Sequence, residues 1–520
     1  MGDVHLIMAL LAAVVLLSLA ARPLHVPHAV VLVIGGIGLG ALPFVPDARL
    51  DPDLILLAFL PPILFPSALA YAREDVLPEL RAIGFLALGL VVATSAAVAV
   101  VAHLALGVPW AAAWVLGAVL GPTDPVSATA VLRAAGAPQR IATILEGESL
   151  INDGTALTLF RIALAAVGAA FVPASAALDF VTIAIGGAVA GAAIGWLVSE
   201  LLRRIEDVEV ESAIAVLTAY GSYVLAEEIH VSGILATVLA GYVIGRRLSE
   251  ISSPETRLRS GSFWALIQFL SETMLFVLVG VVFADSFADE QARSVPELIG
   301  ITLLVTAVVG LTRLAWMFTV PYLLGLVDPK GRSPSVPPAE LLVLVLGGMR
   351  GAVSVAVALA IPATVEGTPF PERDAIVVIA LGSVALLLIG PALALPPVLR
   401  GLGLDDPDAQ AHRLARARIA LAEAALDRAS ELEERRSAPE DLLARARALY
   451  EGRLAGLRHE VGDGDGHGRE DGDAAYRHVL RQLLDAEWRT LRRLESERDV
   501  TGDALRRLER DLDLETRRLR

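Results

Sequence analysis

Thirteen long apolar stretches within the first 400 residues limit what this chain can fold into more than any other feature. A helix needs about 20 apolar residues to cross the hydrocarbon core of a bilayer, and each stretch comes close to that length. The sequence therefore predicts an all-α integral membrane protein with about thirteen transmembrane helices. The predicted spans are residues 4–21, 27–45, 53–71, 83–105, 110–132, 142–172, 176–200, 211–228, 231–245, 262–284, 298–325, 339–361 and 374–399.

Charge divides the chain into two predicted domains. Residues 1–400 form the transmembrane domain, whereas residues 401–520 hold about half of all charged side chains and predict a soluble, helical C-terminal tail. Helical periodicity covers residues 412–436, 440–458 and 475–520, and the acidic, glycine-rich segment 461–473 predicts a flexible linker. The pattern fits a tail that packs on itself and equally a cytoplasmic regulatory domain.

The loops predict an orientation. Loops after odd-numbered spans hold thirteen Lys and Arg residues, and loops after even-numbered spans hold three. The positive-inside rule places the odd-numbered loops and the C-terminus in the cytoplasm and the N-terminus outside. The first stretch follows MGDVH, which lacks a basic segment, so we interpret it as a span and not as a cleaved leader. Two six-helix halves separated by one linker span would form inverted repeats, which are common in secondary transporters.

Composition excludes several classes of function. The chain has no cysteine, which excludes disulfides, thiol catalysis and thiolate metal sites. Its net charge of −15 offers no basic surface for nucleic acid. The sequence lacks a glycine-rich P-loop, so we expect no nucleotide as a partner. We expect the lipid bilayer and small ions as partners, and no cofactor.

The fifth predicted span contains the segment Gly121-Pro122-Thr123-Asp124-Pro125. Because a proline lacks an amide hydrogen and clashes with the preceding turn, two prolines three residues apart predict that the helix unwinds here. Irregular backbone at membrane depth persists only beside protein or a hydrated cavity. A simple proline kink is the alternative, but a kink does not require Asp124. An ionisable group inside a membrane is a functional candidate by default.

The sixth predicted span carries a strip of polar side chains. Ser149 and Asp153 are four residues apart and share a helix face, and Glu148 and Asn152 share the adjacent one. Sodium is a hard cation that prefers oxygen ligands. Carboxylate, hydroxyl and carbonyl oxygens are available at Asp153, Ser149 and Thr123, and we therefore predict a Na⁺ site there.

Two arginines lie inside the predicted eleventh and twelfth spans, Arg313 and Arg350. A buried arginine stays charged and needs an acid or several carbonyls as partners. We expect Glu148 to pair with Arg313 and Arg350 to neutralise helix ends at a second break, with a purely structural salt bridge as the alternative for both. Weaker candidates inside the spans are His103, Arg161, Glu227, Glu228 and Glu272.

Three motifs connect the chain with a known family. GPTDPVSATAVL, EGESLINDGTAL and GGMRGAVSVAVALAIP resemble, in this order, motifs of the monovalent cation:proton antiporter family, which includes bacterial and animal sodium/proton exchangers. FLPPILF and FLSETMLFVLVGVVF are similar to further family segments, so the resemblance covers roughly residues 5–400. It implies a homodimer whose protomers each have a scaffold domain and a mobile core bundle. The core is built around two crossed, discontinuous helices, here spans five and twelve.

The resemblance also implies roles for single residues. The essential ion-binding aspartate of the family falls on Asp153, and the other family positions fall on Asn152, Ser149, Glu148, Thr123, Asp124, Arg313 and Arg350. Two positions depart from the pattern. Met349 replaces the first glycine of a Gly-Arg-Gly triplet, and Pro66, followed by Ser67, stands where some prokaryotic members carry a glutamate. The second departure argues against a carboxylate ligand from the third span.

These observations predict an antiporter of the bacterial inner membrane that serves pH and sodium homeostasis. Asp153 holds either a proton or a cation, so competition for one carboxylate couples the two fluxes during alternating access. Asn152 leaves one titrating group, Asp124 is expected to stay ionised, and one proton then balances one cation. Potassium/proton exchange by the same fold is the first alternative. An ion channel and an intramembrane aspartic protease using Asp124 and Asp153 are more remote alternatives.

Overall fold

The computed structural model describes most of the chain and divides it into two compact units, Met1–Pro407 and Asp408–Arg520. The described residues are 2–21, 28–41, 51–72, 79–167, 173–205, 207–252, 254–288, 293–327, 337–365, 367–404, 407–435 and 439–461, with four more between 487 and 493. Most of the predicted linker 461–473 and of the predicted helical segment 475–520 lies outside them.

The described part of the first unit is helical apart from its loops and one small hairpin of two-residue strands, β1 (Thr364–Val365) and β2 (Thr368–Pro369). The helices are α1 (Gly2–Ala21), α2 (His28–Gly40), α3 (Pro52–Tyr71), α4 (Leu80–Gly84), the π-helical turn η3 (Phe85–Leu90), α5 (Val91–Leu106), α6 (Trp110–Val119), α7 (Pro125–Ala134), α8 (Gln139–Ala165), α9 (Pro173–Leu202), α10 (Val208–Glu228), α11 (Gly233–Ile251), α12 (Pro254–Ala288), α13 (Val295–Val327), α14 (Pro338–Gly347), α15 (Ala352–Leu359) and α16 (Arg373–Leu402).

The helical, membrane-spanning character predicted from the sequence is confirmed. Eight segments of the described chain are long and apolar enough to cross a bilayer, and α1, α2 and α6 contribute shorter apolar helices. The helix α8 has 27 residues, but Arg140, Glu146, Glu148, Asp153 and Arg161 make it too polar to be counted among the eight. Large apolar side chains are exposed along α9, α10 and α13, for example Leu178, Leu217 and Leu311, as expected for surfaces that lipid covers.

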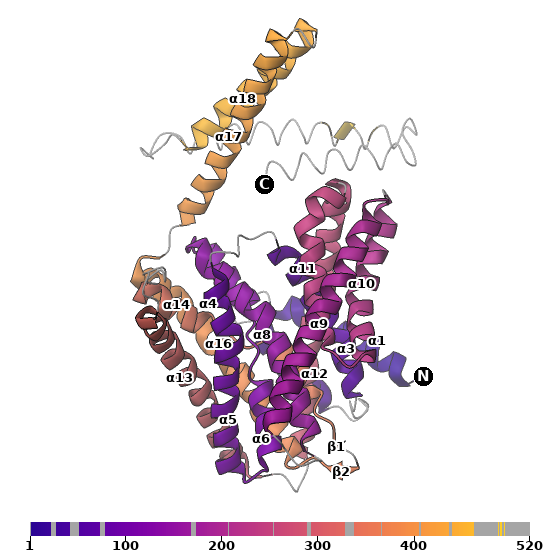
Figure 1. Cartoon of the computed structure of the whole chain (residues 1–520), viewed down its shortest axis with the longest axis vertical. Coiled ribbons are helices and arrows are strands. Elements are labelled where there is room, and N and C mark those ends of the chain that lie inside the picture. Colours follow the sequence, from indigo (N-terminus) through magenta and orange to yellow (C-terminus); the bar gives the residue numbers. More distant parts are fainter. Residues whose placement is uncertain are drawn as a thin grey trace. The chain divides into compact units, whose positions relative to one another are not determined.

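The helices of this unit pack as two groups, which meet around α8 and α15. Figure 1 shows α9, α10 and α11 of one group together on one side and α5, α13 and α16 of the other group together on the opposite side. The first, which we call the α12 group, comprises α1–α3 and α9–α12, with α12 packed along α2 and α11 packed along α9 and α3. The second, the α8 group, comprises η3, α5–α8 and α13–α16. At the boundary α8 contacts α3, α9 and α11, and α15 contacts α3 and α12.

Small residues allow close helix packing inside the α12 group. A Cβ atom added at Gly36 of α2 would lie 2.2 Å from the carbonyl oxygen of Val277 in α12. A Cβ atom added at Gly280 would lie equally close, at 2.2 Å, to the carbonyl oxygen of Val33. Glycines facing each other across two helices are a common packing device in membranes, where backbone contact replaces the hydrophobic driving force.

Two predicted spans are interrupted in the α8 group. The fifth span divides into α6 and α7 around the non-helical residues 120–124, and the twelfth divides into α14 and α15 around residues 348–351. Proline and glycine explain the interruptions, since Pro122 cannot donate to the helix ladder and glycine is a weak helix former. The two interruptions touch, because the amide of Asp124 donates a hydrogen bond of 2.8 Å to the carbonyl of Met349.

The described part of the second unit is a pair of helices, α17 (Pro407–Glu434) and α18 (Glu440–Val461), separated at Pro439. Arg447 pairs with Glu433 at 3.0 Å and Arg458 with Glu423 at 2.7 Å, which places the two helices side by side. Exposed ion pairs of this kind contribute only about 0–1 kcal/mol each. Both helices fall where helical periodicity predicted them.

Candidate functional site

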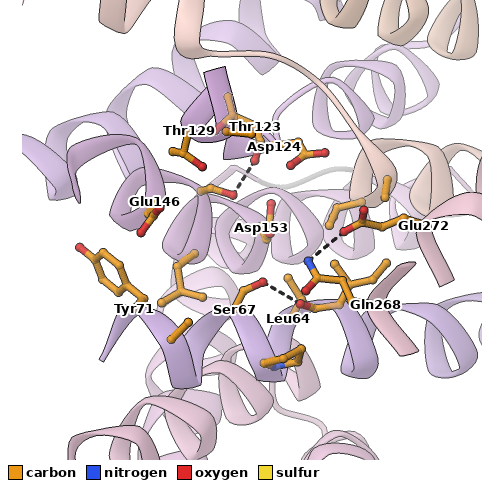
Figure 2. Close-up of a pocket in the computed structure, with 18 of the residues that line it drawn as sticks. Leu64, Ser67, Tyr71, Thr123, Asp124, Thr129, Glu146, Asp153, Gln268 and Glu272 are labelled. Atoms are coloured by element: carbon orange, nitrogen blue, oxygen red, sulfur yellow. Dashed lines mark hydrogen bonds between the residues drawn. The ribbon is translucent and has the colours of Figure 1, made fainter. Parts of the chain in front are cut away.

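A cavity of about 360 Å³ lies at the boundary between the two helix groups (Figure 2). Its walls come from α3, α7, α8, α12, α15 and the interruption between α6 and α7. Four of the predicted ion-site residues line it, Thr123, Asp124, Ser149 and Asp153. The other four, Glu148, Asn152, Arg313 and Arg350, lie behind these in a buried polar network.

Asp153 occupies the middle of α8 and is 2% exposed. Its Oδ1 atom has no hydrogen-bond partner in the described part of the chain. Asp124 and Arg350 are the charged groups whose fields reach it most strongly. A buried carboxylate without a compensating partner is unstable as a bare anion, so this side chain is suited to take up a proton or a cation from the cavity.

Two residues near Asp153 on α8 form hydrogen bonds with the non-helical segment between α6 and α7. The hydroxyl of Ser149 donates a hydrogen bond of 2.6 Å to the carbonyl of Thr123. The amide of Asn152 donates a bond of the same length, 2.6 Å, to the hydroxyl of Thr123. The i, i+3 and i, i+4 spacing on one helix thus brings the Ser149 hydroxyl, the Thr123 carbonyl and the Asp153 carboxylate to one wall of the cavity.

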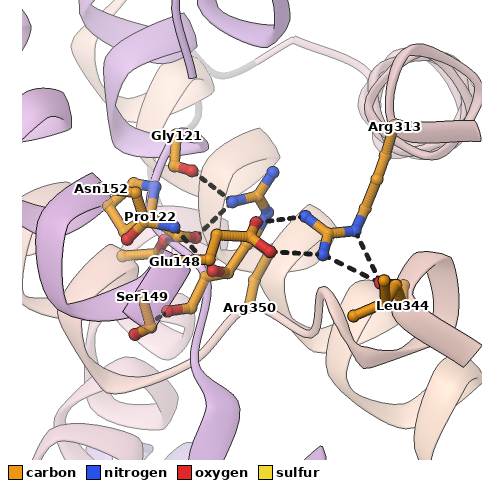
Figure 3. A network of polar contacts seen from close by, with 10 residues as sticks. Gly121, Pro122, Glu148, Ser149, Asn152, Arg313, Leu344 and Arg350 are labelled. Atoms are coloured by element: carbon orange, nitrogen blue, oxygen red, sulfur yellow. Dashed lines mark hydrogen bonds and ion pairs between the residues drawn. The ribbon is translucent and has the colours of Figure 1, made fainter. Parts of the chain in front are cut away.

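Two arginines stabilise the exposed carbonyl ends of the broken helices (Figure 3). The guanidinium of Arg350 donates to the carbonyls of Gly121 and Pro122, just beyond the end of α6. Arg313 donates two hydrogen bonds, of 2.9 and 3.2 Å, to the carbonyl of Leu344 in the last turn of α14. A helix C-terminus carries unsatisfied carbonyls and a partial negative charge, so both contacts are favourable.

Arg313 also pairs with Glu148, as the sequence predicted. Its two terminal nitrogens lie 2.5 and 2.8 Å from the two carboxylate oxygens, and both side chains are almost fully buried, at 4% and 1% exposed. This two-point geometry is the strongest form of arginine–carboxylate contact. The pair joins α8 to α13, and through Leu344 to α14, so it stabilises the frame behind the cavity.

Asp124 lies where α15 begins. A Cβ atom added at Gly351, the residue that precedes α15, would lie 1.9 Å from the Oδ2 atom of Asp124. The carboxylate therefore contacts the start of a helix, where the partial charge is positive. This position supports the prediction that Asp124 remains an anion that compensates a broken helix.

Comparison with known proteins identifies the family. Residues 8–401 match the family described as "Sodium/hydrogen exchanger, transmembrane", which is well over half of the chain. The chain belongs to this family. The family resemblance inferred from the three motifs is therefore confirmed, and the family is one of secondary transporters and not of enzymes.

Similar proteins agree with this assignment. A protein of Mycobacterium tuberculosis named as an uncharacterised Na⁺/H⁺ exchanger is 34% identical over 517 residues, covering 98% of this chain and 95% of the relative. The Na⁺/H⁺ antiporter NhaS2 of Synechocystis is 30% identical and covers 88% of this chain and 81% of its own. The structure of the sodium proton antiporter MjNhaP1 from Methanocaldococcus jannaschii shares the fold, with a TM-score of 0.59 at 20% identity over 78% of this chain and 100% of that one.

The residues that the sequence named as weaker functional candidates make different kinds of contact in this exchanger. Arg161 on α8 forms an ion pair with Glu227 on α10, and Glu227 also accepts a 2.8 Å hydrogen bond from the amide of Gly233. This pair crosses the boundary between the two helix groups. His103 is bonded to the carbonyl of Val108 at 2.8 Å and stacks on Trp110, so it closes the end of α5. Glu228 is exposed.

The sequence did not single out several residues that line the cavity of the exchanger. They are Tyr71 on α3, Thr129 and Arg133 on α7, Glu146 on α8 and Gln268 on α12. Arg133 and Glu146 form a salt bridge of 2.6 Å. Gln268 is four residues before Glu272 on the same helix, and this spacing is a signal that could have found it.

Substitution of Gly351 by alanine is expected to destabilise the exchanger. The new methyl group would overlap the carboxylate of Asp124, whose backbone is fixed by its bond to Met349. Overpacking of this kind lowers the free energy of unfolding by about 1–3 kcal/mol. Thermal unfolding in detergent measures the effect, with Gly390→Ala in α16 as the control, because a Cβ atom there meets nothing within 4 Å. Equal melting temperatures for the two variants would show that Asp124 is not held against α15.

Proposed function

We propose that the protein is a sodium/proton antiporter that exchanges one monovalent cation for one proton by alternating access, for pH and sodium homeostasis. The observation that carries this proposal is Asp153, a buried carboxylate that lines a cavity beside other oxygen ligands and whose Oδ1 atom has no hydrogen-bond partner in the described part of the chain. Membership of the sodium/hydrogen exchanger family supports it, as do relatives named as Na⁺/H⁺ antiporters. Family membership also disfavours a channel or a protease.

The geometry explains how one carboxylate couples two ions. The proposed Na⁺ ligands are the Asp153 carboxylate, the Ser149 hydroxyl and the Thr123 carbonyl. The Thr123 carbonyl already accepts a bond from Ser149, but a carbonyl oxygen has two lone pairs and can serve a cation as well. A proton on Asp153 removes the charge that attracts the cation, and a bound cation excludes the proton. In each conformation, Asp153 of a protomer therefore carries either a proton or a cation.

Within the described part of the α8 group, the other charges around the site have partners. Glu148 pairs with Arg313, Arg350 contacts the carbonyls after α6, and Asp124 contacts the start of α15. Asn152 is neutral and holds the hydroxyl of Thr123. Among the described residues of the α8 group, Asp153 is then the proposed group whose charge changes during the cycle. Exchange of one cation for one proton follows, and it carries no net charge.

The packing supports alternating access by a shift of the α8 group against the α12 group. The proposed site lies at their boundary, where a displacement changes which side of the membrane the cavity reaches. We propose thirteen spans arranged as inverted six-helix repeats, a homodimer, and a location in the bacterial inner membrane with the N-terminus outside. The eight long apolar segments and the three shorter ones are compatible with this count.

The proposal is tested with purified protein in liposomes that contain a pH-sensitive dye. A pulse of Na⁺ outside acidic liposomes is expected to raise the internal pH, and a pulse of choline is expected to leave it unchanged. A pulse of K⁺ measures the main alternative, potassium/proton exchange. A steady voltage-driven Na⁺ current without proton movement would show a channel instead.

Electroneutral exchange gives a prediction about the membrane potential. A potential is worth about 2.3 kcal/mol per uncompensated charge per 100 mV, so a single unbalanced charge shifts the exchange equilibrium visibly. Sodium distribution in liposomes clamped with valinomycin and potassium gradients is expected to be independent of the imposed potential. Sodium accumulation that follows the potential would indicate a second titrating group. Asp124→Asn would then test whether Asp124 is that group.

We propose that residues 401–520 are a cytoplasmic regulatory tail that is dispensable for exchange itself. Every residue of the cavity and of the buried network lies before residue 400, and residues 408–520 form a separate compact unit. A chain ending at Gly403 is expected to keep Na⁺/proton exchange, because it retains every residue that lines the cavity and every residue of the buried network. Loss of exchange in an inserted, dimeric truncated protein would contradict this.

A further inference from the structure

Glu272 lies in the same cavity as Asp124 and Asp153 but belongs to the other helix group (Figure 2). It is part of α12, which packs on α2 and α3, whereas the two aspartates belong to the α8 group. The proposed ion site is therefore faced by a carboxylate from the opposite side of the boundary. The mechanism proposed above makes no use of this residue.

Glu272 differs from the other glutamates at this boundary because no cation compensates it. Glu146 pairs with Arg133, Glu148 with Arg313 and Glu227 with Arg161. Among the residues that the structure describes, no arginine, lysine or histidine forms an ion pair with Glu272. Its hydrogen-bond partner is neutral: the side-chain amide of Gln268 donates a bond of 2.9 Å to Oε1.

The field of Glu272 adds to that of Asp124, since the two carboxylates are close enough to interact electrostatically. Two like charges facing one cavity repel each other unless a cation lies between them. A second, independent observation is the Oδ1 atom of Asp153, which is buried in the same cavity and has no hydrogen-bond partner among the residues that the structure describes. The α3 wall supplies Ser67 and Tyr71 and no acid, so the charge opposite the aspartates comes from α12.

We propose that Glu272 is a cation-recruiting residue of the exchanger, which attracts the monovalent cation into the cavity and presents it to Asp153. Gln268 is a positioning residue that fixes the carboxylate of Glu272 toward the cavity. This inference rests on the proposed antiport function. Because Glu272 belongs to the α12 group, its charge stays with that group while the site on the α8 group moves, so recruitment requires no change in the stoichiometry.

Recruitment by charge predicts a particular kinetic change. Some residues stabilise the bound cation and the transition state of transport by the same amount. Such a residue changes KM and leaves the maximum rate unchanged. Glu272→Gln removes the charge but keeps an oxygen that can accept the Gln268 bond. We expect the KM for Na⁺ to rise about tenfold, the size of one lost Coulomb attraction in a partly hydrated cavity, with the maximum rate within about twofold.

The experiment measures initial exchange rates against Na⁺ concentration in liposomes, first for four proteins and then for a fifth, Gln268→Met. The first four are the wild type, Glu272→Gln, Glu272→Asp and the control Glu228→Gln, which makes the same substitution at an exposed position on α10. Glu272→Asp keeps the charge and is expected to restore KM to within about threefold of the wild type, and Glu228→Gln is expected to leave it unchanged. Gln268→Met keeps the charge of Glu272 but removes its hydrogen bond, and a smaller rise in KM, about threefold, is expected.

Three results would overturn the inference. They are an unchanged KM in Glu272→Gln, a loss of maximum rate with KM unchanged, and an equal rise in KM in Glu272→Gln and Glu272→Asp. If Glu272→Gln does not fold, Gln268→Met keeps the inference testable, since an unchanged KM there would show that the position of the Glu272 carboxylate does not affect cation uptake and would overturn the inference. The wild-type measurement separates this inference from the function on which it rests. A wild type without Na⁺/H⁺ exchange refutes the function, whereas an active wild type with normal kinetics in Glu272→Gln refutes only the recruiting role.

Discussion

Replacement of Asp153 by asparagine is expected to abolish sodium/proton exchange while leaving the protein folded and inserted. Asparagine has nearly the same shape as aspartate. Its neutral amide can neither take up and release a proton nor attract a cation by charge. Asp153 is 2% exposed, and its Oδ1 atom makes no hydrogen bond with any residue that the structure describes, so the substitution breaks no hydrogen bond of that atom there. A neutral amide in place of an uncompensated buried carboxylate is not expected to lower stability.

The measurement is the Na⁺-dependent pH change in liposomes, together with the melting temperature in detergent. We expect no exchange above the level of empty liposomes and a melting temperature equal to or above that of the wild type. Asp374→Asn, the same substitution at an exposed position near the start of α16, is the control and is expected to keep wild-type exchange. Normal exchange in Asp153→Asn would place the shared carboxylate elsewhere.

Substitution of Arg313 by alanine is expected to have the largest effect on stability. It leaves the carboxylate of Glu148 buried without a cation and removes both donors from the carbonyl of Leu344. Removing one partner of a buried ion pair typically lowers the free energy of unfolding by about 3–5 kcal/mol. The glycine at position 348 leaves room for the Arg313 side chain, because a Cβ atom added at Gly348 would lie 2.1 Å from Nε of Arg313.

Thermal unfolding in detergent and the KM for Na⁺ separate a supporting role of Arg313 from a role in transport. We expect a large drop in melting temperature for Arg313→Ala and a KM within about twofold of the wild type. Arg203→Ala, which removes a largely exposed arginine, is the control with little expected change. The double variant Glu148→Leu/Arg313→Met removes both charges and is expected to be more stable than Arg313→Ala. A small change in stability with a large change in KM would assign Arg313 to the transport site.

The sequence was most informative where chemistry is decided locally. Pro122 and Pro125 predicted the first helix interruption, because proline acts on its own backbone wherever the chain folds, and the family resemblance implied the second. The pair of Glu148 and Arg313 was also predictable, since each buried charge needs a partner and few candidates exist. The face shared by Ser149 and Asp153 followed from helix geometry alone.

Contacts between distant helices were less predictable. The sequence suggested that Arg350 neutralises helix ends, but not that its acceptors are the carbonyls of Gly121 and Pro122, more than 200 residues earlier in the chain. Periodicity places Glu272 on a face of α12 without telling which helix that face meets, so its position in the cavity required the fold. The predicted span 83–105 is an α–π–α segment in the structure, because the π-helical turn η3 depends on packing and not on propensity.

The central claim is that a proton and a sodium ion compete for Asp153, and proton release on sodium binding tests it most directly. Titration calorimetry of the detergent-solubilised protein in buffers of different ionisation enthalpy gives the number of protons released per Na⁺ bound. We expect about one proton per Na⁺ for the wild type at a pH where Asp153 is protonated, and neither binding nor release for Asp153→Asn. Sodium binding without proton release, or equal release from Asp153→Asn, would contradict competition at this carboxylate.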